Sequence, residues 1–302
     1  LVTTGGVLLG GVRSGIERVT KALMPALLIL LVALALRAAS LPGAMSGISY
    51  YLRPNLEQLL DVSVLNAALG QAFFSLSLGM GAMLTYGSYL SRRTGIATAT
   101  IWVVILDTAI ALVAGFIIFP AGFSIDGFDP SSSGPGLIFT VLPRLFGSFP
   151  GGQLFGAAFF LLLSMAALSS TISLLEVPVS HFVDTKGWSR PKAVSIVILG
   201  VFALAVPSAL GNGAIDTLSY IPGIGLDFLS LMATVWNNFA LPIGGFFTAV
   251  FVGWVWRGDR ALNELRAHQA WFPAPELWVF LIRWVCPVAI ASIIVATALS
   301  ML

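Results

Sequence analysis

The residues most able to do chemistry lie within one apolar stretch, Ala68 to Tyr89. Polar and small residues occur together in its middle: Gln71, Ser75, Ser77, Gly79 and Gly81. Small residues can let two helices pack closely. They can also interrupt a helix, so that backbone carbonyls and a half-helix N-terminus face a cation and an anionic substrate. We favour a helix broken near Ser75 to Gly79, because a packing face has little use for the long amide of Gln71.

A carboxylate, Asp107, lies about ten residues inside the next apolar stretch. Placing it at the centre of a bilayer costs roughly 2.5–3.5 kcal/mol on insertion scales. Hard cations prefer carboxylate, carbonyl and hydroxyl ligands, so Asp107 with Ser75 and Gln71 predicts an oxygen-lined cation site. Two alternatives stay open: a buried hydrogen-bond acceptor, and a protonated acid, since burial favours the neutral form.

More polar residues follow along the chain. The run Ala166-Ala-Leu-Ser-Ser-Thr-Ile-Ser173 is rich in hydroxyls, although such side chains often hydrogen-bond to their own backbone. Glu176 is a second carboxylate in this apolar span, Asp184 lies at its end, and Asp227 opens a later span. Carboxylates at the middle and at both ends of one bundle indicate a path with gates.

Composition defines the elements that position these residues. Of 302 residues, 58% are hydrophobic and only 9% are charged, and the mean hydropathy is +0.97. Soluble domains carry about 25% charged residues, so most of this surface must face lipid or other helices. A net charge of +2 does not indicate a nucleic-acid partner. One cysteine, Cys286, leaves no internal disulfide or cysteine-rich metal site.

Hydropathy predicts seven helical spans after a leading piece, Leu1 to Val12. Between them, the turn-rich loops Ser40 to Asp61 and Pro120 to Gly152 are predicted outside, the second with a short lid helix over Leu137 to Phe146. The predicted spans are Val19–Leu36, Val62–Leu90, Ala97–Phe119, Gln153–Val183, Lys192–Ser208, Leu226–Trp256 and Pro275–Leu299.

The basic residues predict the orientation of these spans. Eleven of the fifteen Lys and Arg residues fall in one set of loops, including Arg92, Arg93 and Arg190, and Arg283 lies inside the last span. The positive-inside rule places that set in the cytoplasm. We therefore expect a multi-pass protein of the cell inner (plasma) membrane. Because the chain begins inside an apolar stretch without a Met, we also expect a fragment whose start is missing.

The run Gly70-Gln-Ala-Phe-Phe-Ser-Leu-Ser-Leu-Gly-Met-Gly81 resembles the sixth transmembrane segment of the neurotransmitter:sodium symporter family, particularly of its bacterial amino-acid transporters. The similarity runs from the end of the fourth segment through the eleventh. It implies an all-α, polytopic membrane helical bundle with the inverted-repeat, leucine-transporter-like fold, N-terminally truncated, as one partial transmembrane domain over 1–302. Residues 1–36 would end the first repeat, 62–256 would form the second, and 275–299 an extra helix.

The resemblance also implies two sodium sites, a substrate pocket, gates and hinges. Ser75 and Asp107 match the first sodium site; the Ala166 carbonyl, Ser169 and Ser170 match the second. The pocket positions are Phe74, Ser75, Ser77, Met80, Ser170 and Leu174. The gate positions are Phe74 as a lid, Asp227 outside, and Tyr86, Glu176 and Asp184 inside. The hinge positions are Gly79 and the pair Gly15 and Pro25, where a simple kink is the alternative to local unwinding.

Two departures from the family pattern bear on function. Asp107 stands where many relatives have Asn, and a carboxylate there would replace chloride, so we expect no chloride requirement. Met80 stands where Phe is common. A flexible Met can adapt to a large side chain, which favours a bulky hydrophobic or aromatic amino acid as substrate.

The predicted function is therefore sodium-coupled symport of an amino acid across a lipid bilayer by alternating access. The alternatives are a proton-coupled carrier of the same architecture, with Asp107 or Glu176 titrating, and a non-transporting membrane scaffold. An enzyme has least support, because the sequence contains no HExxH or Walker motif, and His181 and His268 both lie at predicted cytoplasmic ends. The oligomeric state is left open.

Overall fold

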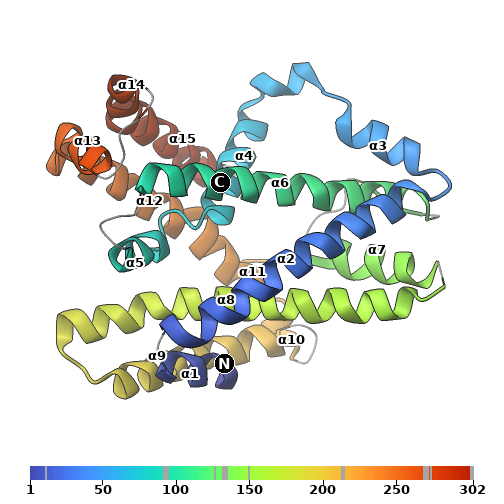
Figure 1. The fold of residues 1–302 in the computed structure, drawn as a ribbon, viewed down its shortest axis with the longest axis horizontal. Helices are drawn as coiled ribbons and strands as arrows, with labels where there is room; N and C mark the ends of the chain where they lie inside the picture. The colour runs from blue at the N-terminus through green and yellow to red at the C-terminus, as the bar shows by residue number, and fades with distance from the viewer. Residues whose placement is uncertain are drawn as a thin grey trace. The chain divides into compact units, whose positions relative to one another are not determined.

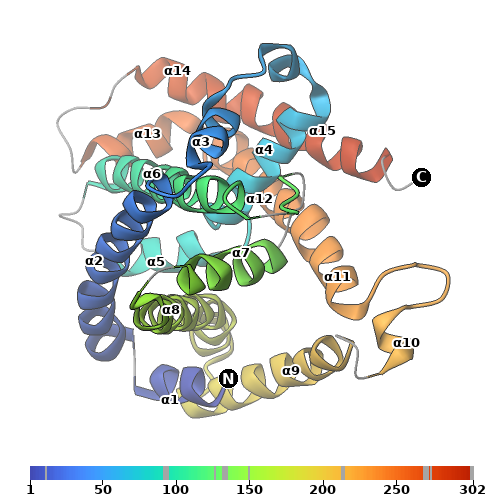
Figure 2. The same ribbon diagram turned by 90° about the vertical axis from the view of Figure 1, so that its right-hand side faces the viewer.

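The computed structural model describes residues 1–10, 12–90, 95–125, 127–130, 135–148, 150–211, 215–267, 272 and 274–299; Arg92, Arg93 and His268 lie outside them. These residues form helices and turns without any strand (Figures 1 and 2), which confirms the all-α prediction. The elements are α1 (Val2–Gly10), α2 (Val12–Ala39), α3 (Ala44–Leu52), η1 (Leu56–Leu60), α4 (Val62–Ser75), α5 (Ala82–Tyr89), α6 (Ile96–Gly122), α7 (Pro135–Gly147), α8 (Gly152–Lys186), α9 (Arg190–Leu210), α10 (Asp216–Ser219), α11 (Phe228–Ala233), η2 (Thr234–Ala240), α12 (Leu241–Val250), η3 (Phe251–Val255), α13 (Gly258–Ala267), α14 (Pro275–Phe280), η4 (Leu281–Val285) and α15 (Cys286–Leu299).

Five predicted spans are helical runs that are long and apolar enough to cross a bilayer: α6, α8, α9, Phe228–Val255 and Pro275–Leu299. The last two runs pass through the π-helical segments η2, η3 and η4 without ending. The first predicted span lies in α2, which bends by 114° into the following helix. The second predicted span, Val62–Leu90, consists of two separate helices, α4 and α5.

The segment Ser40 to Asp61, expected to be a turn-rich loop, is largely helical. Its turn formers serve a helix: Gly43 adopts φ 83° just before α3, and a Cβ on Gly47 would lie 2.4 Å from the Phe119 carbonyl oxygen. Tyr51 also stacks on Phe119, with ring centroids 5.0 Å apart. Aromatic packing and close backbone approach therefore override the turn propensity of the segment. The short helix predicted over Leu137 to Phe146 is confirmed as α7.

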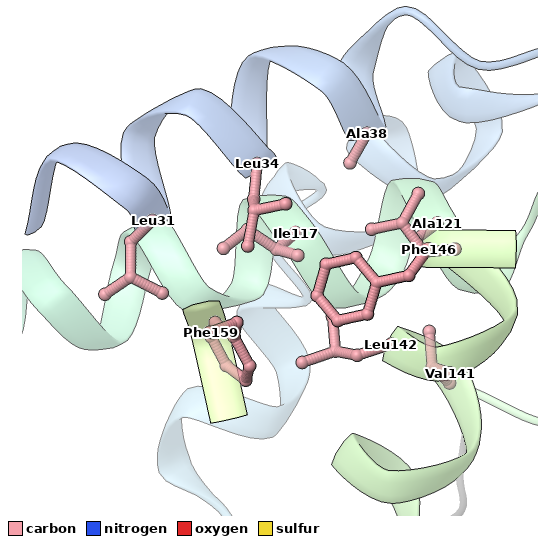
Figure 3. Packing of buried hydrophobic residues seen from close by; sticks show 10 residues of the cluster. Leu31, Leu34, Ala38, Ile117, Ala121, Val141, Leu142, Phe146 and Phe159 are labelled. Atoms are coloured by element: carbon pink, nitrogen blue, oxygen red, sulfur yellow. The ribbon is translucent and has the colours of Figure 1, made fainter. Parts of the chain in front are cut away.

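The chain divides into two compact units, which we describe separately. The first unit contains Leu1–Gly5, Leu56–Val104 and Ser173–Leu302, and the second contains Gly6–Asn55 and Ile105–Ile172. The second unit is built around an apolar core between α2, α6, α7 and α8 (Figure 3). Lipid tails are as apolar as these side chains, so the core gains stability mainly from close packing. The core residues include Leu34, Ile117, Leu142, Phe146 and Phe159.

The core of the first unit joins α4, α12 and α15. Phe73 of α4 packs with Ala249, Ile290 and Ile293. The start of α4 is fixed by Asp61, whose carboxylate accepts hydrogen bonds from the hydroxyl and the N–H of Ser63, both at 2.8 Å. These bonds favour the ionised acid and lower the pKa of Asp61. The half-span that leads to the candidate site is thus held by a cap at its start and by packing near its end.

Candidate functional site

The span Val62–Leu90 is interrupted in its middle. α4 ends at Ser75 and α5 begins at Ala82, and the residues between them, 76–81, are not helical (Figure 1). The interruption predicted from Gln71 and its small neighbours is therefore confirmed. Around such a break the last carbonyls of one helix and the first N–H groups of the next have no helical partner. Those groups that are not paired within the break itself need another partner, because the middle of a bilayer offers no water.

The geometry of the break explains its residue types. α4 ends in a Schellman motif, in which the Leu78 N–H donates to the Phe73 carbonyl at 2.9 Å and the Ser77 N–H donates to the Phe74 carbonyl at 3.2 Å. Ser77 takes the left-handed position with φ 55°. This conformation costs a non-glycine residue roughly 1–2 kcal/mol. Ser77 is half-buried in this position.

Glycines hold the break against α12. A Cβ on Gly244 would lie 2.3 Å from the Gly79 carbonyl oxygen, and a Cβ on Gly79 would lie 2.1 Å from the Leu241 carbonyl oxygen. Each backbone thus occupies the space that a side chain on the other would need. Gly79 also has φ 78°, which disfavours any side chain there. Gly79 is therefore required for two independent reasons, while its predicted role as a hinge stays a prediction.

A cavity of about 480 Å³ lies beside α4, between η2, α12 and α15. Three side-chain amides line it, those of Gln71, Asn237 and Asn238, together with the ring of Phe74. Pro242, also in its wall, has no N–H for the carbonyls of the preceding turn. Gln71 therefore lines a cavity whose wall is about as apolar as it is polar. Asn237 and Asn238 were not predicted as part of the site. Their signal was a pair of amides followed by a proline within an apolar span.

The other half-span, α5, is hydrogen-bonded to α8. Tyr86 Oη donates to Ser173 Oγ at 2.7 Å, and Tyr89 Oη donates to Glu176 Oε1 at 3.0 Å. Tyr86 and Glu176, which resemblance assigned to one gate, are thus not bonded to each other. The tyrosine bonded to the carboxylate is Tyr89, which was not predicted as a gate residue.

Arg190, the first residue of α9, completes this cluster. Its Nη1 donates to Glu176 Oε1 at 3.1 Å and its Nη2 to Oε2 at 2.7 Å. Glu176 is only 1% exposed, so a forked arginine and a tyrosine hydroxyl together compensate a buried carboxylate. The positive-inside pattern predicts Arg190 only as a charge of a cytoplasmic loop, although an acid in an apolar span indicates a cation nearby.

The predicted second sodium site lies along one helix. Ser169 Oγ and Ser170 Oγ both donate to the Ala166 carbonyl, at 2.7 Å and 3.2 Å. The structure therefore brings the three predicted ligands together in the second unit. It does so through the local backbone bonding that is common for hydroxyls in membrane helices, so their role as ligands stays a prediction.

The remaining predicted residues are placed singly. Asp107 is half-buried on α6 in the second unit, whereas Ser75 belongs to the first unit, so the first sodium site also stays a prediction. The described backbone of α2 is helical through both Gly15 and Pro25. Local unwinding at that pair is therefore absent from this structure.

The predicted pocket and gate residues of the first unit differ in exposure. Phe74 and Leu174 are exposed, and Met80 is half-buried within the break. Asp227 caps α11 by accepting a hydrogen bond from the Ser230 N–H at 2.9 Å. Asp184 is exposed in the last turn of α8. Their roles as pocket and gate residues stay predictions.

Bilayer-length helices, a span broken at its midpoint and carboxylates held inside the spans are the features of a multi-pass membrane transporter. The whole chain, residues 1–302, matches the model of the sodium:neurotransmitter symporter family. The chain therefore belongs to this family, as its Gly70–Gly81 run led us to expect. Its members are transporters and not enzymes.

Individual relatives agree with this assignment. The chain is 36% identical to an uncharacterized sodium-dependent transporter, YhdH, of Bacillus subtilis over 93% of this chain and 61% of that protein. It is 27% identical to the sodium- and chloride-dependent glycine transporter 1 of Xenopus laevis over 90% of this chain and 42% of that protein. The chain thus spans about three fifths of the length of the first of these.

A solved structure shows the same fold. The crystal structure of MhsT in complex with L-phenylalanine matches with a TM-score of 0.88 and 41% sequence identity, over 98% of this chain and 66% of that one. The leucine-transporter-like fold predicted from the sequence is therefore confirmed.

Proposed function

We propose that the protein carrying this chain transports an amino acid together with sodium by alternating access. The observation that carries the proposal is the interruption at 76–81, which places unpaired backbone groups beside the hydroxyls of Ser75 and Ser77 in the middle of an apolar span. Carbonyl and hydroxyl oxygens suit a small hard cation. The free N–H groups at the start of α5 suit the carboxylate of an amino acid.

The proposed substrate is a bulky hydrophobic or aromatic amino acid. Phe74 lies just before the broken segment and Met80 lies within it, and both side chains are large and apolar. The flexible thioether of Met80 can adapt to different ring or branched side chains. In support, MhsT, which shares 41% sequence identity with the chain, is named in complex with L-phenylalanine.

The proposed coupling ions occupy two sites. One takes Ser75 and Asp107 as ligands, and the other takes the Ala166 carbonyl with Ser169 and Ser170. Asp107 brings a negative charge of its own, so the proposed transport requires no chloride. In that respect it would differ from the glycine transporter named above as sodium- and chloride-dependent.

The test is uptake of labelled phenylalanine, tryptophan and leucine into proteoliposomes that contain the full-length protein. We expect uptake with an inward sodium gradient, none with potassium or choline in its place, and no change when gluconate replaces chloride. Uptake driven by a proton gradient without sodium would indicate the proton-coupled carrier instead. The absence of both uptake and substrate binding, measured calorimetrically with sodium present, would leave only a scaffold.

A further inference from the structure

Arg283 is a charged residue within an apolar span. It lies eight residues after Pro275 in the run Pro275–Leu299, and no other charged residue follows Glu276 in that run. At 1.5 Å per residue it is about 12 Å from the start of the helix. Arginine stays protonated in proteins, so its charge must meet water or a counter-charge.

Two π-helical segments position the Arg283 backbone. η4 contains Arg283 and packs on η3, where a Cβ on Gly253 would lie 3.0 Å from Arg283 Cα. The Trp254 indole N–H donates to the Arg283 carbonyl at 3.0 Å. This bond compensates the Arg283 carbonyl, because the residue four positions later is Pro287, which has no N–H to donate to it. Contacts from both helical segments therefore fix the position of the Arg283 backbone.

The guanidinium lies at the end of the neighbouring run. Helical side chains tilt toward the helix N-terminus, which directs Arg283 back toward Pro275. Arg283 Cζ accordingly lies 4.5 Å from the centroid of the Trp254 ring. Trp254 is in the last turn before the run Phe228–Val255 ends. The charge thus reaches the level at which tryptophans mark the edge of a bilayer.

The surface around this charge is exposed and partly aromatic. Trp254 is 44% exposed and Trp284 is 51% exposed. The two rings pack edge-on, with their centroids 4.8 Å apart. Arg257 and Arg260, with Asp259 between them, lie within five residues after the end of the same run. Among the described residues, no carboxylate lies within 4.0 Å of Arg283; Glu276, two turns earlier on its own helix, makes no ion pair with it.

We propose that Arg283, with Trp254 and Trp284, binds the phosphate of an anionic phospholipid in the leaflet at the Arg257 end of the bundle. The planar guanidinium suits bidentate binding of a phosphate. Its stacking on Trp254 leaves its edge free for that contact, and the exposed tryptophan faces can pack against the glycerol and upper acyl chain. The positive-inside prediction makes this the cytoplasmic leaflet. The proposal is independent of which solute the protein carries.

The experiment uses native mass spectrometry of the full-length protein with equimolar phosphatidylglycerol and phosphatidylcholine. We expect the wild type to retain phosphatidylglycerol preferentially. Arg283→Gln should lower that preference about fivefold, which corresponds to about 1 kcal/mol, and Arg283→Lys should lower it less. The matched control, Arg53→Gln, changes an exposed arginine in the loop predicted outside and should leave the preference unchanged.

A second measurement does not depend on how a variant folds. Short-chain phosphatidylglycerol should raise the unfolding temperature of the wild type more than phosphatidylcholine does, and glycerol phosphate should leave it unchanged, which separates a lipid from a free phosphate. Equal shifts with both lipids, or an Arg283→Gln variant with wild-type preference, would overturn the proposal. If only Arg53→Gln lost the preference for phosphatidylglycerol, the lipid would bind at the opposite face, and the proposal would be overturned as well.

Discussion

Adding one methyl group at Gly244 should move the broken segment of the candidate site. A Cβ there would lie 2.3 Å from the Gly79 carbonyl oxygen, whereas ordinary C···O contacts are about 3.3–3.6 Å. Gly244→Ala therefore forces α12 and the break apart by about 1 Å. Both sides of the contact are backbone, so no side-chain rotation can relieve it. Overpacking of this kind costs about 1–3 kcal/mol.

The cost should appear in ligand affinity. If the break yields, its carbonyls and the Ser75 and Ser77 groups leave their positions, and the sodium concentration for half-maximal phenylalanine uptake should rise by about 5-fold to about 150-fold. The assay is sodium-dependent uptake in proteoliposomes, with thermal unfolding of the same protein. If α12 yields instead, the unfolding temperature should fall.

The matched control is Gly200→Ala on α9, where an added Cβ would meet nothing within 4 Å. Alanine is favoured over glycine in a helix by roughly 0.5–1 kcal/mol, so this variant should be at least as stable as the wild type and transport normally. A Gly244→Ala protein with wild-type sodium dependence and wild-type stability would refute the idea that the glycine contact positions the break.

Three further outcomes are expected for the full-length protein. Asp107→Ala should abolish sodium-coupled substrate binding in calorimetry far more than Ser77→Ala does; equal, mild effects would mean that the cation site is misplaced. Asp107→Asn should make uptake depend on chloride, measured by gluconate replacement, and chloride-independent uptake by this variant would contradict the charge-replacement argument. Arg190→Ala leaves the Glu176 carboxylate buried without its cation and should destabilise the protein by about 3 kcal/mol in thermal unfolding. Adding Glu176→Gln should recover most of that loss, and a double variant no more stable than Arg190→Ala would argue against the ion pair as the cause.

Local patterns predicted much of this molecule. Uniform apolar runs gave the spans, and Gln71 among small residues gave the interruption, because a buried amide and left-handed backbone leave a clear trace in residue type. The helix α3 was missed, since its glycines and tyrosines act through packing on Phe119. Arg190 and Tyr89 were missed for a related reason. Their significance comes from Glu176, which is remote along the chain, and no local pattern pairs them.

The two halves of the interrupted span are anchored to different neighbours. Phe73 fixes the end of α4 within a core shared with α12 and α15, while Tyr86 and Tyr89 fix α5 to α8. A tilt of one half need not break the bonds of the other, because the dihedral change can be confined to residues 76–81. Hydrogen exchange should therefore show different protection of the backbone amides in α4 and in α5, although hydropathy alone predicts a single helix over both.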